Sequence, residues 1–195
     1  SITETSMVLK PPRGLIFDRF GELLVTNQAV YDLMVIPRQI KDLDTLAFCE
    51  LLGIEKADFI ARMNSKDIRK ARHKSHILVS HIMPSDYARI SEKLNDFKGF
   101  FGQPTTMRYY PKPIAALFLG DVREVAQSHI DKDPYYVPGD YVGDGGIEKA
   151  YEVYLRGKKG VKFFYRDNRG LLQDVAEGRL DSSASTGVDV HSTID

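Results

Sequence analysis

The spacing of hydrophobic residues changes along the chain and divides it into a base and an insertion. Near both ends, short apolar runs alternate with turn residues, a pattern typical of β-strands. In residues 42–97, by contrast, hydrophobic residues recur at helical intervals. We therefore predict an α+β fold in which a β-rich base, formed by residues 1–41 and 98–195, carries an inserted α/β head lobe of residues 42–97.

Two hairpins are predicted in the base. Residues 18–21 (DRFG) and 167–170 (DNRG) each separate two apolar runs and end in glycine, the residue that best tolerates a positive φ. Further strands are predicted at residues 30–37, 107–110 and 188–194. The first two of these strands end at or just before a proline, which cannot donate a backbone hydrogen bond to a neighbouring strand.

The head lobe is predicted to contain helices that each have one apolar face. Residues 75–82 are β-branched and apolar and predict a strand among these helices, and Pro84 is well placed to begin a helix. The single cysteine, Cys49, belongs to the first apolar face, where an unpaired thiol acts as a small hydrophobic group. The predicted faces consist of Leu46, Cys49 and Leu52, then Phe59, Ile60 and Met63, and later Tyr87, Ile90 and Leu94.

Two loops and one helix are predicted in the second half of the base. Residues 99–105 are rich in turn formers, and residues 130–146 form a long loop rich in Asp, Pro, Tyr and Gly. Residues 147–155 have the periodicity of a helix, and Gly157 is placed to cap its C-terminus. The apolar face of this helix is predicted to consist of Ile147, Ala150, Tyr151, Tyr154 and Leu155.

Composition and charge narrow the possible functions. A chain of 195 residues, 43% of them hydrophobic, is long and apolar enough to fold as about one or two domains. Its 27 Lys and Arg residues equal its 27 Asp and Glu residues, so no net positive field favours nucleic acid as a partner. The sequence contains neither a run of about 18 apolar residues nor a signal peptide. Because it starts in a polar stretch and stops directly after a predicted strand, we expect it to be a piece of a longer protein.

The residues that could bind a metal ion or a cofactor do not have the required spacing. His73, His76 and His81 are close in sequence but lack the i, i+4 helical spacing of a metal site. The aspartates in residues 130–146 are out of register with a calcium loop and are interpreted as turn formers. The basic residues 69–74 are interpreted as a solvated helix end. We therefore predict neither a metal site nor a cofactor.

Three separated segments resemble the conserved boxes of class B penicillin-binding proteins. Residues 13–21 contain an Arg-Gly pair, three residues, Asp-Arg, any residue and Gly. Residues 107–111 (MRYYP) resemble the second box, and residues 139–160 resemble the third in the form typical of penicillin-binding protein 2. Residues 187–195 resemble the family's entry into its transpeptidase domain. The motif residues are Arg13, Gly14, Asp18, Arg19, Gly21, Arg108, Tyr110, Pro111, Gly146, Glu148, Tyr151, Gly157 and Gly160.

This resemblance implies a pedestal, or dimerisation, domain of a peptidoglycan D,D-transpeptidase that acts in cell-wall elongation and cell shape. The parent protein would be anchored in the bacterial inner membrane by a helix outside this chain, with the pedestal on the periplasmic side. Implied partners are the parent's own C-terminal transpeptidase domain, a RodA-type glycosyltransferase and an MreC-type scaffold protein. The alternatives are a division-type or low-affinity class B protein, or an independent secreted binding domain.

No residue of this chain is expected to be catalytic. The family's nucleophile lies in Ser-x-x-Lys, with Ser-x-Asn and Lys-[Ser/Thr]-Gly completing the site. None of these three patterns occurs in the sequence, and Ser185-Thr186-Gly187 lacks the lysine that the last of them requires. A serine without a base is not activated as a nucleophile. Catalysis is therefore assigned to a part of the parent protein outside this chain.

The charged residues of the first box need partners, because an unpaired charge beside apolar strands is costly to bury. We expect Arg13, Asp18 and Arg19 to join an ion-pair network with Glu148 or Glu152. Such a network would tie the first hairpin to the late helix. Ordinary surface residues at a hairpin tip are the alternative.

Three phenylalanines, Phe97, Phe100 and Phe101, cluster at the predicted exit from the head lobe. They are interpreted either as a docking patch for a partner or as packing between the two lobes. Because the hydrophobic period changes here and the exit is rich in Gly and Pro, we also predict that residues 42–97 are the movable part of the domain.

Overall fold

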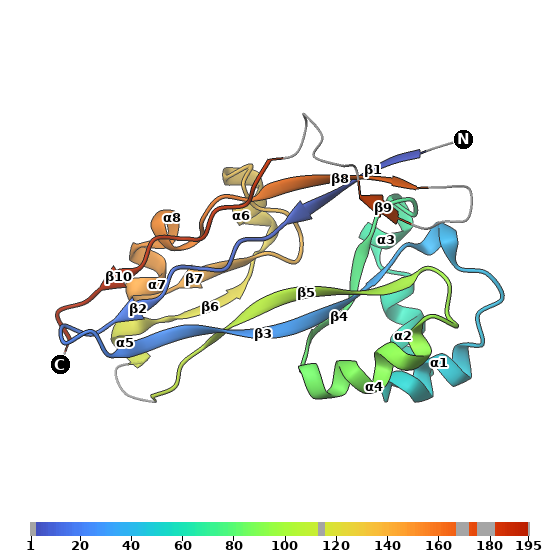
Figure 1. Cartoon of the computed structure of the whole chain (residues 1–195), viewed down its shortest axis with the longest axis horizontal. Helices are drawn as coiled ribbons and strands as arrows, with labels where there is room; N and C mark the ends of the chain where they lie inside the picture. Colours follow the sequence, from blue (N-terminus) through green and yellow to red (C-terminus); the bar gives the residue numbers. More distant parts are fainter. Residues whose placement is uncertain (1–2, 113–115, 167–171, 175–181, 195) are drawn as a thin grey trace. The chain divides into compact units, whose positions relative to one another are not determined.

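The fold is known from a computed structural model (Figure 1), and the chain divides into two compact units. Unit 1 comprises Ser1–Asn27 and Arg108–Asp195, and unit 2 comprises Gln28–Met107. Strands β3 (Leu23–Val35) and β5 (Phe100–Tyr109) contribute residues to both units. The structure describes residues 3–112, 116–166, 172–174 and 182–194.

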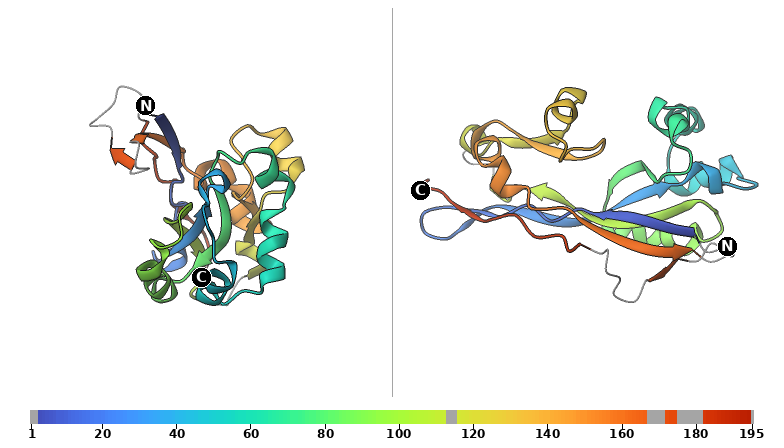
Figure 2. Two further views of the ribbon diagram at one scale, coloured as in Figure 1. Left: turned by 90° about the vertical axis from the view of Figure 1, so that its right-hand side faces the viewer. Right: turned by 90° about the horizontal axis from the view of Figure 1, so that it is seen from above.

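In unit 1, strands from opposite ends of the chain pair with each other. β1 (Thr3–Leu9) is antiparallel to β8 (Gly160–Arg166), from Thr3 opposite Arg166 to Leu9 opposite Gly160. The two strands lie side by side in every view (Figures 1 and 2). β9 (Leu172–Asp174) pairs with the other edge of β8, which confirms the two strands of the second predicted hairpin. The turn predicted between them, at residues 167–170, lies outside the described residues.

The first predicted hairpin is confirmed. β2 (Ile16–Phe17) is antiparallel to the start of β3, and the turn between them is closed by Asp18. The Asp18 carboxylate, 5% exposed, accepts hydrogen bonds from the Phe20 amide at 2.8 Å and the Glu22 amide at 2.7 Å. Gly21 completes the turn with a φ of +82°, a conformation that favours glycine.

The late part of unit 1 is built from short elements. β6 and β7 form a two-stranded antiparallel sheet, and β10 pairs in parallel with β2. Leu119 and Leu155 from this part pack with Ile16, Leu24 and Val25 of the hairpin in one buried cluster. The elements are α5 (Ala116–Leu119), β6 (Asp121–Glu124), α6 (Gln127–Lys132), β7 (Tyr141–Asp144), α7 (Gly146–Ala150), α8 (Glu152–Leu155) and β10 (Val190–His191).

Unit 2 combines the remaining parts of β3 and β5 with β4 and a set of helices. β3 pairs with β4 and β5, and the rings of Phe48, Phe59 and Phe100 lie at the centre of the core. Asp44 caps α1 by accepting from the amides of the first helical turn, and Gly53 ends that helix with a φ of +66°. The elements are η1 (Pro37–Gln39), α1 (Thr45–Leu52), α2 (Lys56–Met63), α3 (Lys66–Lys70), β4 (His76–Ile82) and α4 (Pro84–Leu94).

Several predicted elements of unit 2 are confirmed, but the predicted helix faces are partly wrong. The strand at residues 75–82 and the helix start at Pro84 are present, and Cys49 is buried. Leu46 and Ile60, however, are 66% and 44% exposed, and neighbouring phenylalanines occupy the core in their place. In helices of eight residues, helical spacing alone does not decide which side faces the core.

The late helix also differs from its prediction. It is interrupted at Tyr151, whose φ of −107° separates α7 from α8. Ala150, Tyr151 and Tyr154 of the predicted apolar face are exposed, the two tyrosines to 45% and 61%, whereas Leu155 is fully buried. Gly157 follows α8 with a φ of +69°, which confirms the predicted C-terminal cap.

The strand predicted at residues 30–37 is confirmed as far as Val35, whereas most of the turn-rich segment predicted at residues 99–105 is a strand. The run at residues 30–37 is the second half of β3, and β5 begins at Phe100 where a turn was predicted. The predicted loop at residues 130–146 contains the end of α6 and all of β7, and the last strand is limited to Val190–His191. β1 and β6 were not predicted, because their sequences are mainly polar.

The two units nest in the chain as the predicted base and lobe do, but their boundaries differ. Unit 2 begins at Gln28 and ends at Met107, whereas the head lobe was predicted at residues 42–97. The added residues are in β3 and β5, and Leu33, Val35 and Phe100 of these strands belong to the core of unit 2. Strand residues that pack against the helices are therefore part of that unit.

Candidate functional site: a buried charge network

The site lies entirely within unit 1 and starts with the position of Arg13. Gly14, the next residue, donates its amide to the Leu155 carbonyl at 2.9 Å. A Cβ atom at Gly14 would lie 2.0 Å from the Val188 carbonyl oxygen, so only glycine allows this close approach. The backbone beside Arg13 is thereby fixed against the end of α8.

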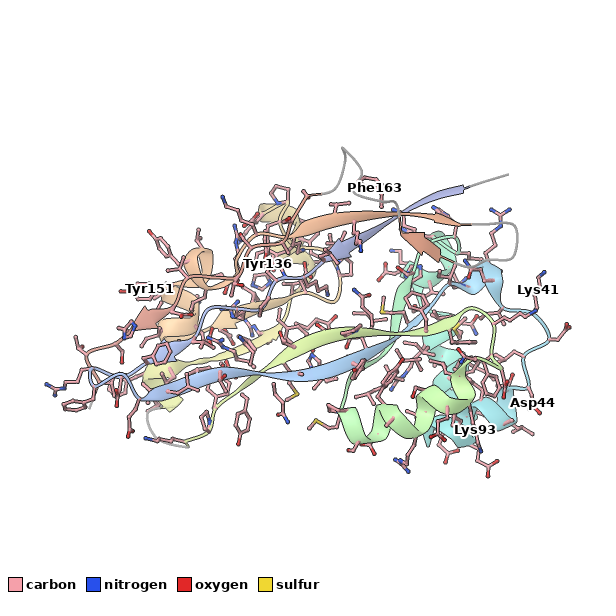
Figure 3. The ribbon with its side chains drawn as sticks, in the orientation of Figure 1. Lys41, Asp44, Lys93, Tyr136, Tyr151 and Phe163 are labelled. Atoms are coloured by element: carbon pink, nitrogen blue, oxygen red, sulfur yellow. The ribbon has the colours of Figure 1, made fainter. Side chains whose placement is uncertain are left out.

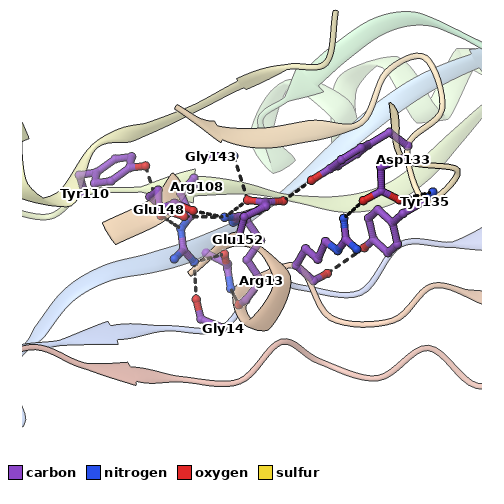
Figure 4. Close-up of polar contacts among 12 residues, drawn as sticks. Arg13, Gly14, Arg108, Tyr110, Asp133, Tyr135, Gly143, Glu148 and Glu152 are labelled. Carbon is purple, nitrogen blue, oxygen red and sulfur yellow. Dashed lines mark hydrogen bonds and ion pairs between the residues drawn. The ribbon is translucent and has the colours of Figure 1, made fainter. Parts of the chain in front are cut away.

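Glu148 is the centre of the network (Figure 4) and its side chain is fully buried on α7. One carboxylate oxygen, Oε2, accepts from Arg13 Nη2 at 2.7 Å, and the other, Oε1, accepts from Arg108 Nε at 2.5 Å. The Tyr110 hydroxyl lies 3.4 Å from Oε1. Gly143 lets β7 approach α7, because a Cβ there would be 2.2 Å from the Glu148 carbonyl oxygen.

Arg108, at the end of β5, joins separate segments of unit 1. Its side chain is 1% exposed, and Nη1 donates to the Gly14 carbonyl at 2.7 Å and to Asn27 Oδ1 at 3.0 Å. Asn27 in turn donates to the Arg13 carbonyl at 2.7 Å. The guanidinium therefore holds the first box, β3 and α7 together through charge-assisted hydrogen bonds.

Glu152, at the start of α8, supplies the second negative charge. Its Oε2 accepts from Arg13 Nη2 at 2.8 Å and from the Gly143 amide at 2.9 Å, and its Oε1 accepts from the Tyr136 hydroxyl at 2.7 Å. Two arginines and two glutamates therefore pair with one another in a part of unit 1 that is shielded from water. Balanced, hydrogen-bonded charges are the form in which ionic groups are tolerated inside a protein.

The pKa shifts follow from burial and from the opposite charges. Burial by itself would lower the pKa of Arg13, but its hydrogen bond to Glu152 and the charges of Glu148 and Glu152 raise it. Burial would raise the pKa of Glu152, but the hydrogen bond and charge of Arg13 and the Gly143 amide lower it. For Arg108, burial outweighs the attraction of Glu148 and lowers the pKa. Burial, followed by the charge of Glu148, raises the pKa of Tyr110. The network therefore favours the ionised form of Glu152 and the neutral form of Tyr110.

A second cluster surrounds Asp140, which is 5% exposed. Its carboxylate accepts from the Val137 amide at 2.9 Å and pairs with the ammonium groups of Lys159 and, at 3.2 Å, Lys10. Lys10 also donates to the Gly139 carbonyl at 3.0 Å. These contacts fix the loop before β7 to the residues that follow β1 and precede β8.

Tyr135 and Arg156 continue this cluster. The Arg156 guanidinium lies 4.1 Å from the centre of the Tyr135 ring and pairs with Asp133 at 2.6 Å. Burial raises the pKa of Tyr135 to about 12, and burial with the hydrogen bond to Glu152 raises that of Tyr136 to about 12. A surface pocket of about 440 Å³ beside these residues is lined by Pro134, Tyr135, Val153, Arg156, Gly157, Lys158 and Lys159.

A comparison with known families identifies the family to which this chain belongs. Residues 8–192 match the family described as the penicillin-binding protein dimerisation domain. The chain belongs to this family. The match covers both units, so every member of the network lies inside the matched region.

Named relatives of this dimerisation domain include peptidoglycan D,D-transpeptidases. The chain is 29% identical over 201 residues to the peptidoglycan D,D-transpeptidase MrdA of Salmonella typhimurium, covering 95% of this chain and 30% of that protein. It is 26% identical to MrdA of Haemophilus influenzae, covering 96% and 30%, and 26% identical to penicillin-binding protein 3 of Bacillus subtilis, covering 97% and 28%. The chain thus spans about 30% of the length of the curated relatives it matches.

A solved structure shows the same fold. It is a complex between penicillin-binding protein 2 and MreC from Helicobacter pylori, matched with a TM-score of 0.73 and 24% sequence identity. The match covers 97% of this chain and 35% of that chain. The α+β fold of a penicillin-binding protein dimerisation domain is therefore confirmed over nearly the whole sequence.

The predicted network is present in the dimerisation domain, but its membership differs from the prediction. Arg13 pairs with both Glu148 and Glu152, as predicted. Asp18 was expected in the same network, but its buried carboxylate caps its own turn instead. Arg19 is exposed, its amide donates to the Ile194 carbonyl at 3.2 Å, and its guanidinium lies 5.5 Å from the centre of the Phe20 ring. The amides of a tight turn can supply all the hydrogen bonds that an aspartate needs, and the spacing of charges along the sequence does not show when this happens.

The second box supplies two members of the charge network for which the sequence predicted no partner. Arg108 and Tyr110 both contact Glu148, and Pro111 is exposed just after β5. An arginine in an otherwise extended stretch is the signal that could have identified Arg108 as a network member. Asp140 and Lys159 were also missed, because their partners are distant in sequence.

The glycines of the family motif mark close backbone contacts. Gly146 begins α7 with a φ of +48°, and a Cβ there would lie 2.2 Å from the Phe118 carbonyl oxygen. A Cβ at Gly157 would lie 2.4 Å from the Ser185 carbonyl oxygen, and one at Gly160 would lie 2.4 Å from the Ala184 amide nitrogen. All three positions require glycine for packing, and Gly146 and Gly157 require it also for their positive φ.

The phenylalanines predicted as a docking patch lie in unit 2. Phe100 is 7% exposed, with its ring centre 4.1 Å from that of Phe48, and the Phe97 ring is 5.1 Å from Phe48. Phe100 is therefore a core residue rather than a docking residue, and Phe97 packs beside it. The docking role of the half-buried Phe101 stays a prediction.

Within residues 3–112, 116–166, 172–174 and 182–194, no helix is long and apolar enough to cross a membrane. In the same part of the chain, no three His, Cys, Asp or Glu side chains are grouped so that they could hold a metal ion.

Proposed function

We propose that this chain is the pedestal of a class B penicillin-binding protein of the elongation type, a peptidoglycan D,D-transpeptidase that maintains cell shape. The MrdA relatives support a D,D-transpeptidase as the parent protein, and the family match supports the place of the chain beside a catalytic domain. In this proposal the pedestal lies on the periplasmic side of the inner membrane, and a helix outside this chain anchors the parent protein.

The observation that carries the proposal is the buried network around Glu148. Arg13, Arg108, Glu148 and Glu152 contribute charges from four separate segments, and all four are at most 12% exposed. None of these four side chains belongs to a group of acid, base and nucleophile like that of a hydrolytic site. A paired, buried network positions backbone segments, so we assign it a mechanical role.

The pedestal is proposed to act by positioning and docking, without chemistry of its own. The serine and lysine motifs of the transpeptidase reaction are missing from the sequence. Its proposed partners are its own transpeptidase domain, an MreC-type scaffold protein and a RodA-type glycosyltransferase. The solved Helicobacter pylori complex of penicillin-binding protein 2 with MreC supports the second of these.

A labelling experiment separates the pedestal from the catalytic part. The 195-residue chain should not react covalently with a fluorescent penicillin, whereas the full-length protein that carries it should be labelled. Labelling of the isolated chain would show that the chemistry resides here and would refute the assignment. A full-length protein that also fails to bind the drug would refute the transpeptidase proposal.

A cell-shape experiment tests the mechanical role. Glu148→Ala in the full-length protein should impair rescue of rod shape in a strain depleted of its own copy, while the protein still accumulates and binds penicillin. Arg123→Ala, in the same unit, breaks an exposed ion pair with Asp144 and serves as the matched control. Equal rescue by both variants would remove the support for a positioning role.

A further inference from the structure

Exposed basic residues are concentrated on one segment of unit 2. Residues 66–74 contain five Lys or Arg residues and one acid, Asp67, although the whole chain carries equal numbers of basic and acidic residues. All five cations are exposed to solvent. We call this set the basic segment; it consists of Lys66, Arg69, Lys70, Arg72 and Lys74.

The basic segment is held in place by its own backbone and by one buried side chain. Ile68 of α3, the helix labelled in Figure 1, is 6% exposed and belongs to the core of unit 2, whereas the charged residues around it are exposed. After α3, the Arg72 carbonyl accepts from the Arg38 amide at 2.9 Å, which adds another exposed arginine beside the segment. The His76 ring lies 2.8 Å from the Ala71 carbonyl. The cations are therefore displayed by an ordered backbone.

The described structure offers these cations no acidic partner. Among the described residues, the ion pairs involve other side chains, such as Arg89 with Asp86 on α4. Figure 3 shows that unit 2 carries other charges, among them Lys41, Asp44 and Lys93, where both signs are mixed. Like charges gathered without counter-charges repel one another and do not stabilise the fold. Their concentration is explained better by an external anion than by folding.

We propose that the basic segment binds the carboxylates of peptidoglycan stem peptides, an inference that rests on the proposed function. A stem peptide that has not been cross-linked ends in a carboxylate, and arginine binds carboxylates through two parallel hydrogen bonds. Repeated stems along one glycan strand would let several weak contacts act together. The pedestal would thus hold the polymer on which the parent protein acts.

The side chains favour this polymer over the other large anions. Binding to a membrane surface is strengthened by apolar side chains that enter the lipid, but none of the exposed large hydrophobic residues lies in residues 66–74. Binding to single-stranded nucleic acid uses aromatic rings that stack on bases, and residues 66–74 contain no aromatic residue other than His73. Carboxylate recognition needs only the charges that are present.

The test is co-sedimentation of the 195-residue chain with insoluble peptidoglycan from a strain with low cross-linking. The triple variant Lys66→Gln, Arg69→Gln and Lys70→Gln should bind at least about fivefold more weakly, as expected for the loss of several exposed ion pairs. The control, Lys41→Gln, Lys93→Gln and Lys98→Gln, removes the same charge from exposed positions of the same unit and should bind within about twofold of the parent chain. Circular dichroism should show both variants folded.

Two further arms identify the anion. Binding should be lost when the carboxylates of the peptidoglycan are amidated, and it should weaken as salt rises from about 0.05 M to about 0.5 M. Equal losses in the two triple variants would overturn the proposal, as would full binding to amidated peptidoglycan. Binding to phosphatidylglycerol vesicles but not to peptidoglycan would assign the segment to the membrane instead. None of these results affects the penicillin and cell-shape tests, so failure here is distinguishable from failure of the proposed function.

Discussion

At the scale of single residues, the buried network around Glu148 costs free energy to remove from water, but it specifies which segments of the chain can meet. Burying an ion pair is expensive, and apolar residues of similar size often stabilise a protein as well. The two ion pairs of Glu148 instead restrict which segments can meet, because Arg13 binds its Oε2 atom and Arg108 binds its Oε1 atom. Removing one partner then leaves the other charge buried. This asymmetry leads to the first two predictions.

Arg108→Ala should lower the free energy of unfolding of unit 1 by about 3–5 kcal/mol, because the fully buried carboxyl group of Glu148 loses one of its two arginine partners. Urea unfolding followed by a probe in unit 1 measures the change. Arg123→Ala should change the same quantity by less than about 1 kcal/mol, since its ion pair with Asp144 is exposed. Similar losses for the two variants would mean that the buried ion pairs stabilise unit 1 no more than the exposed one does.

Acid should destabilise unit 1 through Glu152. Its folded-state pKa is lowered, so its stabilising contribution is complete above the unfolded pKa of about 4.3 and is lost as the pH falls through the folded value. Glu152→Gln should therefore make unit 1 less stable at neutral pH but less sensitive to acid between about pH 5 and about pH 3. Urea unfolding across this range tests it. The exposed Glu124→Gln should keep the parent's acid sensitivity.

At the scale of elements, the C-terminal segment is bound to the first box by backbone contacts. Val190 and Ser192 donate their amides to the carbonyls of Leu15 and Phe17, each at 2.8 Å. The Asp189 carboxylate accepts from the Leu15 amide at 2.7 Å. These bonds depend on a close approach at Gly187, so a single methyl group there tests the arrangement.

Gly187→Ala should release residues 187–192 from β2, because a Cβ would lie 1.8 Å from the Leu155 carbonyl oxygen and 2.6 Å from the Gly14 amide nitrogen. Overpacking of this kind costs about 1–3 kcal/mol. Hydrogen exchange should show lost protection at the Val190 and Ser192 amides. Val188→Ala, at a side chain that is 61% exposed, should leave that protection intact. Unchanged protection in the glycine variant would mean that the segment tolerates a shift.

The sequence predicted the elements whose signals are local and missed those that depend on distant partners. The hairpin at residues 18–21 and the helix start at Pro84 follow from turn and capping chemistry in a few neighbouring residues. β1 could not be predicted, because its strand character comes from pairing with β8, more than 150 residues later. The pairing of Arg13 with Glu148 was predicted from the cost of burying an unpaired charge, whereas Arg108, whose partner Glu148 lies 40 residues later, was assigned no partner.

At the scale of the whole molecule, each unit has its own hydrophobic core. The aromatic cluster around Phe48 lies in unit 2, and the clusters that contain Leu155 and Tyr136 lie in unit 1. The charge network belongs to unit 1, whereas the basic segment belongs to unit 2. Because each core is built from residues of its own unit, damage to one core can leave the other intact. This leads to a prediction about how the chain unfolds.

Phe48→Ala should destabilise unit 2 by about 3–5 kcal/mol, because its fully buried ring contacts the rings of Phe59, Phe97 and Phe100. Hydrogen exchange should then show faster exchange at the amides of unit 2, such as Ile54. The Gly14 and Lys149 amides of unit 1, which donate to the Leu155 and Gly145 carbonyls, should keep the protection of the parent chain.

The reciprocal variant decides whether the two cores unfold separately. Leu155→Ala removes a fully buried side chain from unit 1 and should expose the Gly14 and Lys149 amides while leaving Ile54 protected. If either variant instead accelerates exchange equally in both units, the chain unfolds as one cooperative body. The strands β3 and β5, which contribute to both units, would then transmit the loss of one core to the other.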